Sequence, residues 1–189
     1  MKTKIRIAIQ KKGRLKDESL EFLRQLGLKF PDNRLLTAYK NVELLKVRCS
    51  DIPTYIEQGA ADFGIIGENQ LIEKPATVTI IKKLDFGRCS LVIAAPKIKD
   101  LEGERIATSY PRTLKKFLRE KGIAASVIEI RGSVEVTPAL GLADAICDIT
   151  QSGNTLRENG LKIQSKILDS QAILIGKSSQ LWKSIITQK

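Results

Sequence analysis

The amino-acid sequence predicts an α/β protein built from two lobes. Strand and helix patterns alternate from residue 4 to about residue 80, an order typical of sheets covered by helices. Extended apolar runs at 80–84 and 89–95 then lead into a second set of strands and helices, so we expect them to cross between lobes. A last apolar run at 172–175 is expected to return the chain to the first lobe.

We place the lobe boundaries at these crossings. Lobe I is predicted to contain residues 1–86 and 170–189, and lobe II is predicted to contain residues 87–169. Within lobe I we expect strands at 5–9, 42–47 and 62–67, and a final helix at 178–186. Within lobe II we expect strands at 106–108, 126–131 and 145–149, and a helix at 111–121.

The first predicted strand runs into a loop that carries several cations. Lys11, Lys12 and Arg14 surround Gly13, just after the alternating run at 5–9. Open α/β sheets bind ligands outside the carboxyl ends of their strands, which is where this loop should lie. Arginine can grip a phosphate through two parallel hydrogen bonds, while lysine acts as a point charge. We expect Lys12 to be solvated and Arg14 to face a ligand.

Two further strand ends in lobe I have features of a ligand site. Arg48 follows the strand at 42–47 and precedes a short predicted helix. Gly67 ends the strand at 62–67, where a bulky side chain would block a ligand or a neighbouring backbone. Ligand approach and simple packing are both open explanations for Gly67.

The loop at 150–154 predicts an anion site in lobe II. It joins the strand at 145–149 to a helix at 155–159, and its side chains are small or carry hydroxyl and amide groups. Backbone N–H groups of such a loop can converge on one phosphate, and Gly153 permits close approach of the backbone. Asp148 precedes the loop and suits a ribose diol or a metal, because a carboxylate repels phosphate. The alternative, a capped helix after a strand, stays open.

Composition favours a compact enzyme that does not rely on histidine. The chain has 189 residues, enough for one large or two small domains, and only 5% are aromatic, so the core should be aliphatic. No stretch approaches the roughly 20 apolar residues of a membrane span, and the first residues lack a signal peptide's apolar segment. We therefore expect a cytoplasmic protein without a membrane contact. The absence of histidine excludes Ser-His and Cys-His nucleophiles and His-ligated zinc.

The net charge of +11 indicates anionic ligands. Lysines and arginines are spread along the chain, without the interleaved aromatic residues of an RNA platform or a dense basic tail. Small anionic substrates account for part of the excess charge, and a lysine-rich surface accounts for the rest. We therefore expect no nucleic-acid partner.

Six motifs occur in order along nearly the whole chain. They are AIQKKGRL at 8–15, DIP at 51–53 with GAADFGIIGEN at 59–69, LDFG at 84–87, RIATSYP at 105–111, GSVEVTP at 132–138, and GLAD at 141–144 continuing to NGL at 159–161. Together they resemble the catalytic part of ATP phosphoribosyltransferase. Six ordered motifs of this length are far more specific than any single glycine loop.

The resemblance implies a fold and a reaction. The implied fold has two α/β lobes, like a periplasmic binding protein of the second type, with the active site in the cleft between the lobes. The implied reaction transfers phosphoribosyl from 5-phosphoribosyl 1-diphosphate to N1 of the adenine of ATP and releases pyrophosphate. This is the first step of histidine biosynthesis. It requires Mg²⁺, which we expect to be held mainly by substrate phosphates.

The resemblance also implies roles for individual residues. The phosphoribosyl diphosphate is expected to contact Thr150, Gln151, Ser152, Gly153, Asn154 and Thr155, with its 5-phosphate on the last five. Asp148 and Glu135 are expected to face the ribose hydroxyls. The catalytic cations Lys11, Arg14 and Arg48 are expected to face the diphosphate and the phosphates of ATP. Gly67, together with Lys11 and Arg14, is expected to line the nucleotide site.

The chain length implies a particular assembly. Long members of the family continue into a histidine-binding domain, and here only about a dozen residues follow Ile175, so we expect no C-terminal regulatory domain. Short members work with a regulatory subunit that resembles histidyl-tRNA synthetase. We therefore expect a homodimer within a hetero-oligomer. The motif at 10–14 also resembles that of long members, so a truncated long form stays an alternative.

A binding module is the competing hypothesis from a different functional class. The same two-lobed fold can capture an anionic metabolite without turnover, because one fold can support several functions. A simple solute receptor does not require the loop at 150–154 together with Asp148. This combination favours the enzyme.

Overall fold

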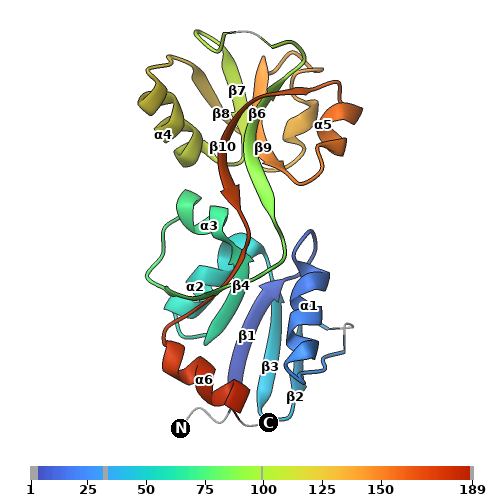
Figure 1. Cartoon of the computed structure of the whole chain (residues 1–189), viewed down its shortest axis with the longest axis vertical. Coiled ribbons are helices and arrows are strands. Elements are labelled where there is room, and N and C mark those ends of the chain that lie inside the picture. The colour runs from blue at the N-terminus through green and yellow to red at the C-terminus, as the bar shows by residue number, and fades with distance from the viewer. Residues whose placement is uncertain (1–3, 32–33, 99, 188–189) are drawn as a thin grey trace. The chain divides into compact units, whose positions relative to one another are not determined.

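A computed structural model describes residues 4–31, 34–98 and 100–187 (Figure 1). The chain forms an α/β fold with two compact units, as the alternation of strand and helix patterns predicts. Unit 1 contains Met1–Gly87 and Gln171–Lys189, and unit 2 contains Arg88–Ser170.

Unit 1 contains a six-stranded mixed sheet with the order β2-β3-β1-β4-β11-β5. Strand β1 pairs in parallel with both β3 and β4, so the carboxyl ends of these three strands lie at the same edge. Strand β11 is antiparallel to β4 and β5, and β2 is antiparallel to β3. The strands are β1 (Ile5–Gln10), β2 (Leu36–Tyr39), β3 (Val42–Val47), β4 (Phe63–Gly67), β5 (Thr79–Lys83) and β11 (Ala172–Gly176).

Both faces of this sheet are buried, because successive side chains of a strand point to opposite faces. Ile7 and Ile9 of β1 pack in one cluster with Leu23 and Trp182, while Ala8 packs in another with Ile56. The first cluster includes side chains of α1 and α6, and the second includes side chains of α2. The helices of unit 1 are α1 (Lys16–Gln25), α2 (Ile52–Glu57), α3 (Glu68–Glu73) and α6 (Ser179–Thr187), with the 3-10 turn η1 (Cys49–Asp51) before α2.

Unit 2 contains a five-stranded sheet with the order β10-β6-β9-β7-β8. Strand β7 is parallel to β8 and β9, whereas β6 is antiparallel to β9 and β10. Its strands are β6 (Cys89–Ala95), β7 (Arg105–Thr108), β8 (Ser126–Glu129), β9 (Ala145–Thr150) and β10 (Lys162–Ser170). Its helices are α4 (Pro111–Lys121) and α5 (Asn154–Glu158), with the 3-10 turn η2 (Val134–Val136).

The sheet of unit 2 is also covered on both faces. Ile93 of β6 and Cys147 of β9 pack in a cluster with Leu114 of α4. Ile146 of β9 packs in a second cluster, which contains Leu156 of α5. Helices α4 and α5 therefore pack against opposite faces, and β9 runs between the two cores into the predicted anion loop.

Several element boundaries differ from the predictions. Strand β8 ends at Glu129 rather than at residue 131, and α5 begins one residue earlier than expected, at Asn154. Strands β2 and β10 and helix α3 were not predicted. Strand β10 lacks a regular alternation of polar and apolar residues, because its register shifts twice against β6. Among the described helices, none is long and apolar enough to cross a membrane.

Candidate functional site

The carboxyl ends of β1, β3 and β4 lie side by side at one edge of unit 1. The Lys11 backbone N–H donates a 2.7 Å hydrogen bond to the Val47 carbonyl, which joins the loop after β1 to the end of β3. Gly67 ends β4, and its neighbour Glu68 begins α3. The three strand ends that the sequence marks as ligand-binding therefore meet at one edge of the sheet.

The Arg14 side chain contacts two other parts of this edge. Its guanidinium donates a hydrogen bond to the Gly87 carbonyl. A Cβ atom on Gly67 would lie 3.4 Å from Arg14 Nη2 and 2.3 Å from Asn69 Oδ1. Real Cβ atoms do not approach to 2.3 Å, so a side chain at position 67 would force the buried Asn69 carboxamide to move, and packing against Asn69 favours glycine there.

The Cys49 thiol lies close to Gly67 and Arg14 but is not charged. Burial raises the pKa of this thiol, against the opposing effects of a hydrogen bond from the Gly67 backbone and of the Arg14 charge. A raised pKa keeps the thiol protonated at neutral pH. Cys49 therefore leaves the positive charge of Arg14 uncompensated.

The three predicted catalytic cations differ from the structural arginines of the chain. Arg6 is held by the Glu43 carboxylate at 2.7 Å, and Arg105 is held by the Asp144 carboxylate at 3.0 Å. Within the described part of the chain, no carboxylate forms an ion pair with any of the three cations Lys11, Arg14 and Arg48. Lys11 and Arg48 are exposed, and Arg14 is half-buried. Their charges are therefore available to an anionic ligand.

In unit 2, the loop after β9 has the geometry of a small-residue turn. Gly153 has a φ angle of +75°, a conformation that glycine adopts without strain. The Gly153 N–H donates to Thr150 Oγ1 at 3.0 Å, and the Asn154 N–H donates to Ser152 Oγ at 3.3 Å. Two N–H groups of the loop thus bond hydroxyls of the same loop. An anion that accepts from these N–H groups would have to displace those hydroxyls.

The helix dipole contributes less to this site than the sequence suggested. Helix α5 has five residues, so few peptide dipoles are aligned behind the loop. Its first residue, Asn154, accepts a hydrogen bond from the Arg157 side chain through Oδ1. We expect the loop N–H groups and hydroxyls to supply most of the binding free energy of an anion.

Asp148 is partly buried and feels the charge of Glu135. The pKa of Asp148 is raised to about 6, mainly by burial and further by the Glu135 charge. The Ile149 N–H opposes this shift, because it donates a 2.8 Å hydrogen bond to Asp148 Oδ1. Glu135 lies in η2, which packs on β9. The structure thus brings together the two acids that were expected to face one ribose.

The raised pKa of Asp148 predicts a pH-dependent stability. The folded-state pKa of about 6 lies above the ordinary aspartate pKa of 3.8, so folding favours the protonated carboxyl. This favourable contribution is complete below pH 4 and is lost as the pH rises through 6, when the buried charge costs about 3 kcal/mol.

We therefore expect Asp148→Asn to raise the free energy of unfolding by about 1–3 kcal/mol at pH 8 and to change it little at pH 4. Urea unfolding at the two pH values measures this difference. Asp169→Asn is the control, because the pKa of Asp169 is lowered by hydrogen bonds from Lys166 and Ser90. An equal effect of Asp148→Asn at both pH values would contradict the assignment.

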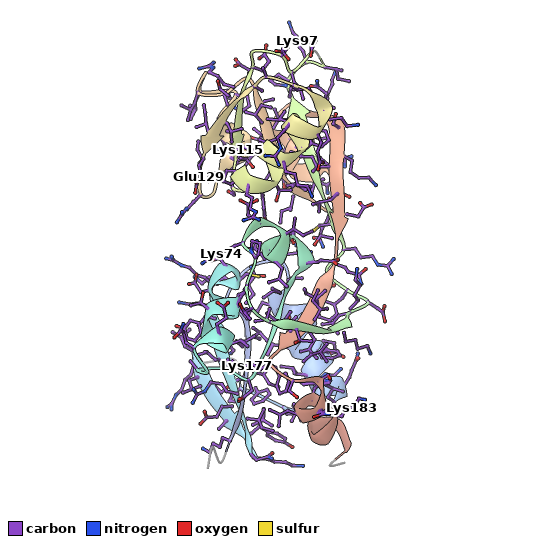
Figure 2. All side chains as sticks on the ribbon, turned by 90° about the vertical axis from the view of Figure 1, so that its left-hand side faces the viewer. Lys74, Lys97, Lys115, Glu129, Lys177 and Lys183 are labelled. Carbon is purple, nitrogen blue, oxygen red and sulfur yellow. The ribbon has the colours of Figure 1, made fainter. Side chains whose placement is uncertain are left out.

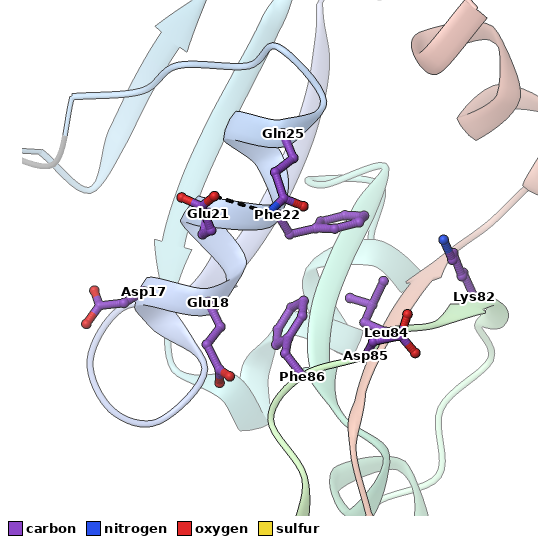
Figure 3. Close-up of a pocket in the computed structure, with 9 residues that line it drawn as sticks. All are labelled: Asp17, Glu18, Glu21, Phe22, Gln25, Lys82, Leu84, Asp85 and Phe86. Atoms are coloured by element: carbon purple, nitrogen blue, oxygen red, sulfur yellow. Dashed lines mark hydrogen bonds between the residues drawn. The ribbon is translucent and has the colours of Figure 1, made fainter.

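A pocket of about 590 Å³ lies elsewhere in unit 1 (Figure 3). Phe22 of α1 and Phe86 line it, with their ring centroids 6.2 Å apart. Its charged side chains are Lys82 and four carboxylates, those of Asp17, Glu18, Glu21 and Asp85. Carboxylates repel phosphates, and none of the predicted site residues lines this pocket. The charge of its lining therefore does not favour a phosphate.

Lysines are distributed over both units rather than gathered on one element. Figure 2 labels Lys74, Lys177 and Lys183 on unit 1 and Lys97 and Lys115 on unit 2. This distribution agrees with the expectation that much of the +11 charge belongs to a lysine-rich surface.

Sequence reasoning missed two polar side chains at the edge of unit 1. Gln10, the last residue of β1, accepts a hydrogen bond from the Leu15 N–H through Oε1 at 3.1 Å. Asn69 is 2% exposed and packs against Gly67. The only signal for either was a polar residue at a strand end near glycine, which is too common to single out.

Comparisons with known proteins place these features in a family. The family model described as ATP phosphoribosyltransferase matches residues 48–188. An ATP phosphoribosyltransferase from Maricaulis maris is 42% identical over 195 aligned residues, which cover 95% of this chain and 66% of the relative. The chain spans 64–66% of the length of three curated relatives that it matches.

Two solved structures share the fold over nearly the whole chain. One belongs to an ATP phosphoribosyl transferase (HisG:HisZ) complex from Thermotoga maritima, with a TM-score of 0.81, 30% identity, and coverage of 98% of this chain and all of that one. The other is the periplasmic VFT2 domain of BvgS from Bordetella pertussis, with a TM-score of 0.63, 16% identity, and coverage of 97% and 92%. The second likeness shows the fold alone, which is the two-lobed, periplasmic-binding-protein-like fold that the resemblance implied. On the family match and these likenesses, the chain belongs to the ATP phosphoribosyltransferase family.

Proposed function

We propose that this chain catalyses transfer of phosphoribosyl from 5-phosphoribosyl 1-diphosphate to N1 of ATP, with release of pyrophosphate. This reaction is the first step of histidine biosynthesis. The observation that carries the proposal is the loop after β9, preceded by the carboxyl pair Asp148 and Glu135, in a chain of this family. A phosphate loop and an acidic pair suit the two ends of a ribose 5-phosphate.

Unit 2 supplies the groups that bind the sugar phosphate in this proposal. The 5-phosphate accepts hydrogen bonds from the backbone and hydroxyl groups of the loop, and the ribose hydroxyls donate to Asp148 and Glu135. Hydroxyls donate better to a charged carboxylate, so a pKa of about 6 leaves Asp148 mostly ready to accept at neutral pH. The loop residues are Thr150, Gln151, Ser152, Gly153, Asn154 and Thr155.

Unit 1 supplies the cations. Lys11, Arg14 and Arg48 bind the diphosphate and the phosphates of ATP, and Gly67 lines the nucleotide site where the strand ends meet. The absence of ion-pair partners in the described part of the chain supports this role, because each charge can be neutralised by a phosphate. Arg14 is the central residue, since its guanidinium is half-buried and fixed to Gly87.

The chemistry in this proposal depends on positioning and electrostatics. The bond between C1 of the ribose and the diphosphate oxygen breaks, the diphosphate leaves with the bonding electrons, and adenine N1 donates its lone pair to C1. Positive charge develops on the sugar and negative charge on the leaving group, so fixed cations stabilise the transition state. Adenine N1 is already a nucleophile, which agrees with a chain that lacks histidine.

The acidic pair also fits a magnesium ion. Among the residues that the structure describes, no three His, Cys, Asp or Glu side chains gather as a ready metal site. Mg²⁺ commonly takes one or two carboxylates and completes its shell with substrate phosphates, which Asp148 and Glu135 allow. When bound with the diphosphate, Mg²⁺ neutralises the developing negative charge.

The assembly is part of the same proposal. The structurally similar Thermotoga maritima chain comes from a HisG:HisZ complex. We infer that this chain forms a homodimer, that it joins a regulatory subunit resembling histidyl-tRNA synthetase in a hetero-oligomer, and that it works in the cytoplasm. Histidine inhibition of the isolated chain would contradict the need for that subunit.

Absorbance-monitored formation of phosphoribosyl-ATP tests the proposed activity. The purified chain is assayed with ATP, phosphoribosyl diphosphate and Mg²⁺, first alone and then with a candidate regulatory subunit. Turnover in either mixture supports the enzyme, and turnover by the chain alone assigns the partner to regulation. Binding of both substrates without turnover in either mixture would favour the binding-module hypothesis.

A further inference from the structure

The loop between β1 and α1 is fixed by several hydrogen bonds. The Lys11 N–H donates to the Val47 carbonyl at 2.7 Å, and the Lys16 N–H donates to the Gly13 carbonyl at 3.1 Å. These backbone bonds fix the beginning and the end of the loop. Arg14, which carries the charge, lies between them.

The Gln10 side chain spans this loop. Its Oε1 accepts a 3.1 Å hydrogen bond from the Leu15 N–H, five residues later. Leu15 is the N-cap residue of α1, and its own side chain makes no capping hydrogen bond. Gln10 thus satisfies the backbone N–H of the N-cap residue, the group that a Glu or Gln side chain satisfies in a capping box.

The Gln10 side chain also restricts which residue fits at position 13. A Cβ atom at this position would lie 2.6 Å from Gln10 Nε2, too close for any real contact. The φ angle of Gly13 is +104°, which L side chains rarely adopt. The carboxamide of Gln10 therefore packs directly on the Gly13 backbone, next to Arg14.

We propose that Gln10 is a positioning residue, which holds the loop at 11–15 so that Lys11 and Arg14 face the substrate phosphates. This inference rests on the proposed function. Gln10 acts through Arg14 and Lys11 rather than through the reacting atoms. The carboxamide oxygen is the group that matters, because it bonds the Leu15 N–H.

Gln10→Met tests this role, because methionine keeps the length of the side chain and removes the hydrogen-bond acceptor. We expect the Leu15 amide to exchange its hydrogen about tenfold faster and kcat/KM to fall about tenfold, the size of one lost hydrogen bond. Gln10→Glu should restore slow exchange, since a carboxylate also accepts. Gln25→Met is the matched control, because the Gln25 side chain is exposed on α1 and, among the described residues, hydrogen-bonds to Glu21 alone.

A double variant separates positioning from a general structural effect. In an Arg14→Ala background, Gln10→Met should reduce kcat/KM by clearly less than tenfold, because its route through Arg14 is already lost and only its route through Lys11 remains. A full tenfold loss in that background would overturn the proposal. So would equal Leu15 amide exchange in the wild type and Gln10→Met. If the wild type shows no turnover, the affinity for tripolyphosphate is measured in place of kcat/KM, with the same expected changes for each variant. This second measurement distinguishes failure of the proposed function from failure of the role of Gln10.

Discussion

Arg14→Glu is expected to reduce the turnover of phosphoribosyl-ATP by about 1,000-fold, the scale of removing a charge-stabilising arginine from a phosphate site. The substitution removes a cation that has no carboxylate partner within the described residues and adds a charge that repels both substrates. The fold should persist, because the main structural loss is the hydrogen bond to the Gly87 carbonyl, worth about 1 kcal/mol. Steady-state kinetics and thermal unfolding together measure the two effects.

Arg34→Glu is the matched control for this variant. Arg34 is an exposed arginine of the same unit and lies outside the loops at the strand ends. We expect it to keep nearly normal kcat/KM, which shows that the overall charge change is not the cause. Arg14→Ala adds no new charge and should still lose about 100-fold. A normal rate in Arg14→Ala, with the protein folded, would remove Arg14 from the site.

Gly153→Val is expected to weaken binding of phosphoribosyl diphosphate by about 100-fold. A Cβ atom at this position would lie 3.9 Å from Arg157 Nη1 and closer than 4 Å to no other described atom outside the neighbouring residues, so the surrounding protein leaves room there. Valine would instead strain the φ angle of +75°, at a cost of about 1–2 kcal/mol, and crowd the phosphate. Calorimetric titration of phosphoribosyl diphosphate measures the loss.

Gly160→Val separates strain from loss of the site. Gly160 follows the other end of α5, has a φ angle of +68°, and has open space around its Cβ position. Both variants should therefore lose similar stability, but only Gly153→Val should lose affinity. Unchanged affinity in Gly153→Val, or equal losses in both variants, would place the 5-phosphate site elsewhere.

Elements with strong local signals could be predicted from the sequence. Helix α4 has Pro111 at its start and Gly122 at its end, and its predicted range agrees with the structure. Strand β1 was recognised from its alternating pattern, and β9 from a short, partly β-branched apolar run, which is typical of a strand buried on both faces. Strand β10 was missed, since its bulges break the alternating pattern.

The candidate site was predictable only in part, for a similar reason. Lys11, Arg14 and Arg48 follow strands whose parallel pairing brings their ends together, so their shared edge follows from topology. The position of the Gln10 side chain against Gly13 depends on a rotamer and on a turn, and no periodic pattern specifies either. The same holds for the buried environment that raises the pKa of Asp148 to about 6.

Product identification tests the central claim most directly. The chain, with its regulatory subunit if required, is incubated with ATP, phosphoribosyl diphosphate and Mg²⁺, and the products are resolved by ³¹P and proton NMR. We predict that pyrophosphate and an adenine N1-linked phosphoribosyl nucleotide form in equal amounts, and only when both substrates are present. Pyrophosphate release without ATP, or no N1-linked product although both substrates bind, would contradict the proposed transferase activity.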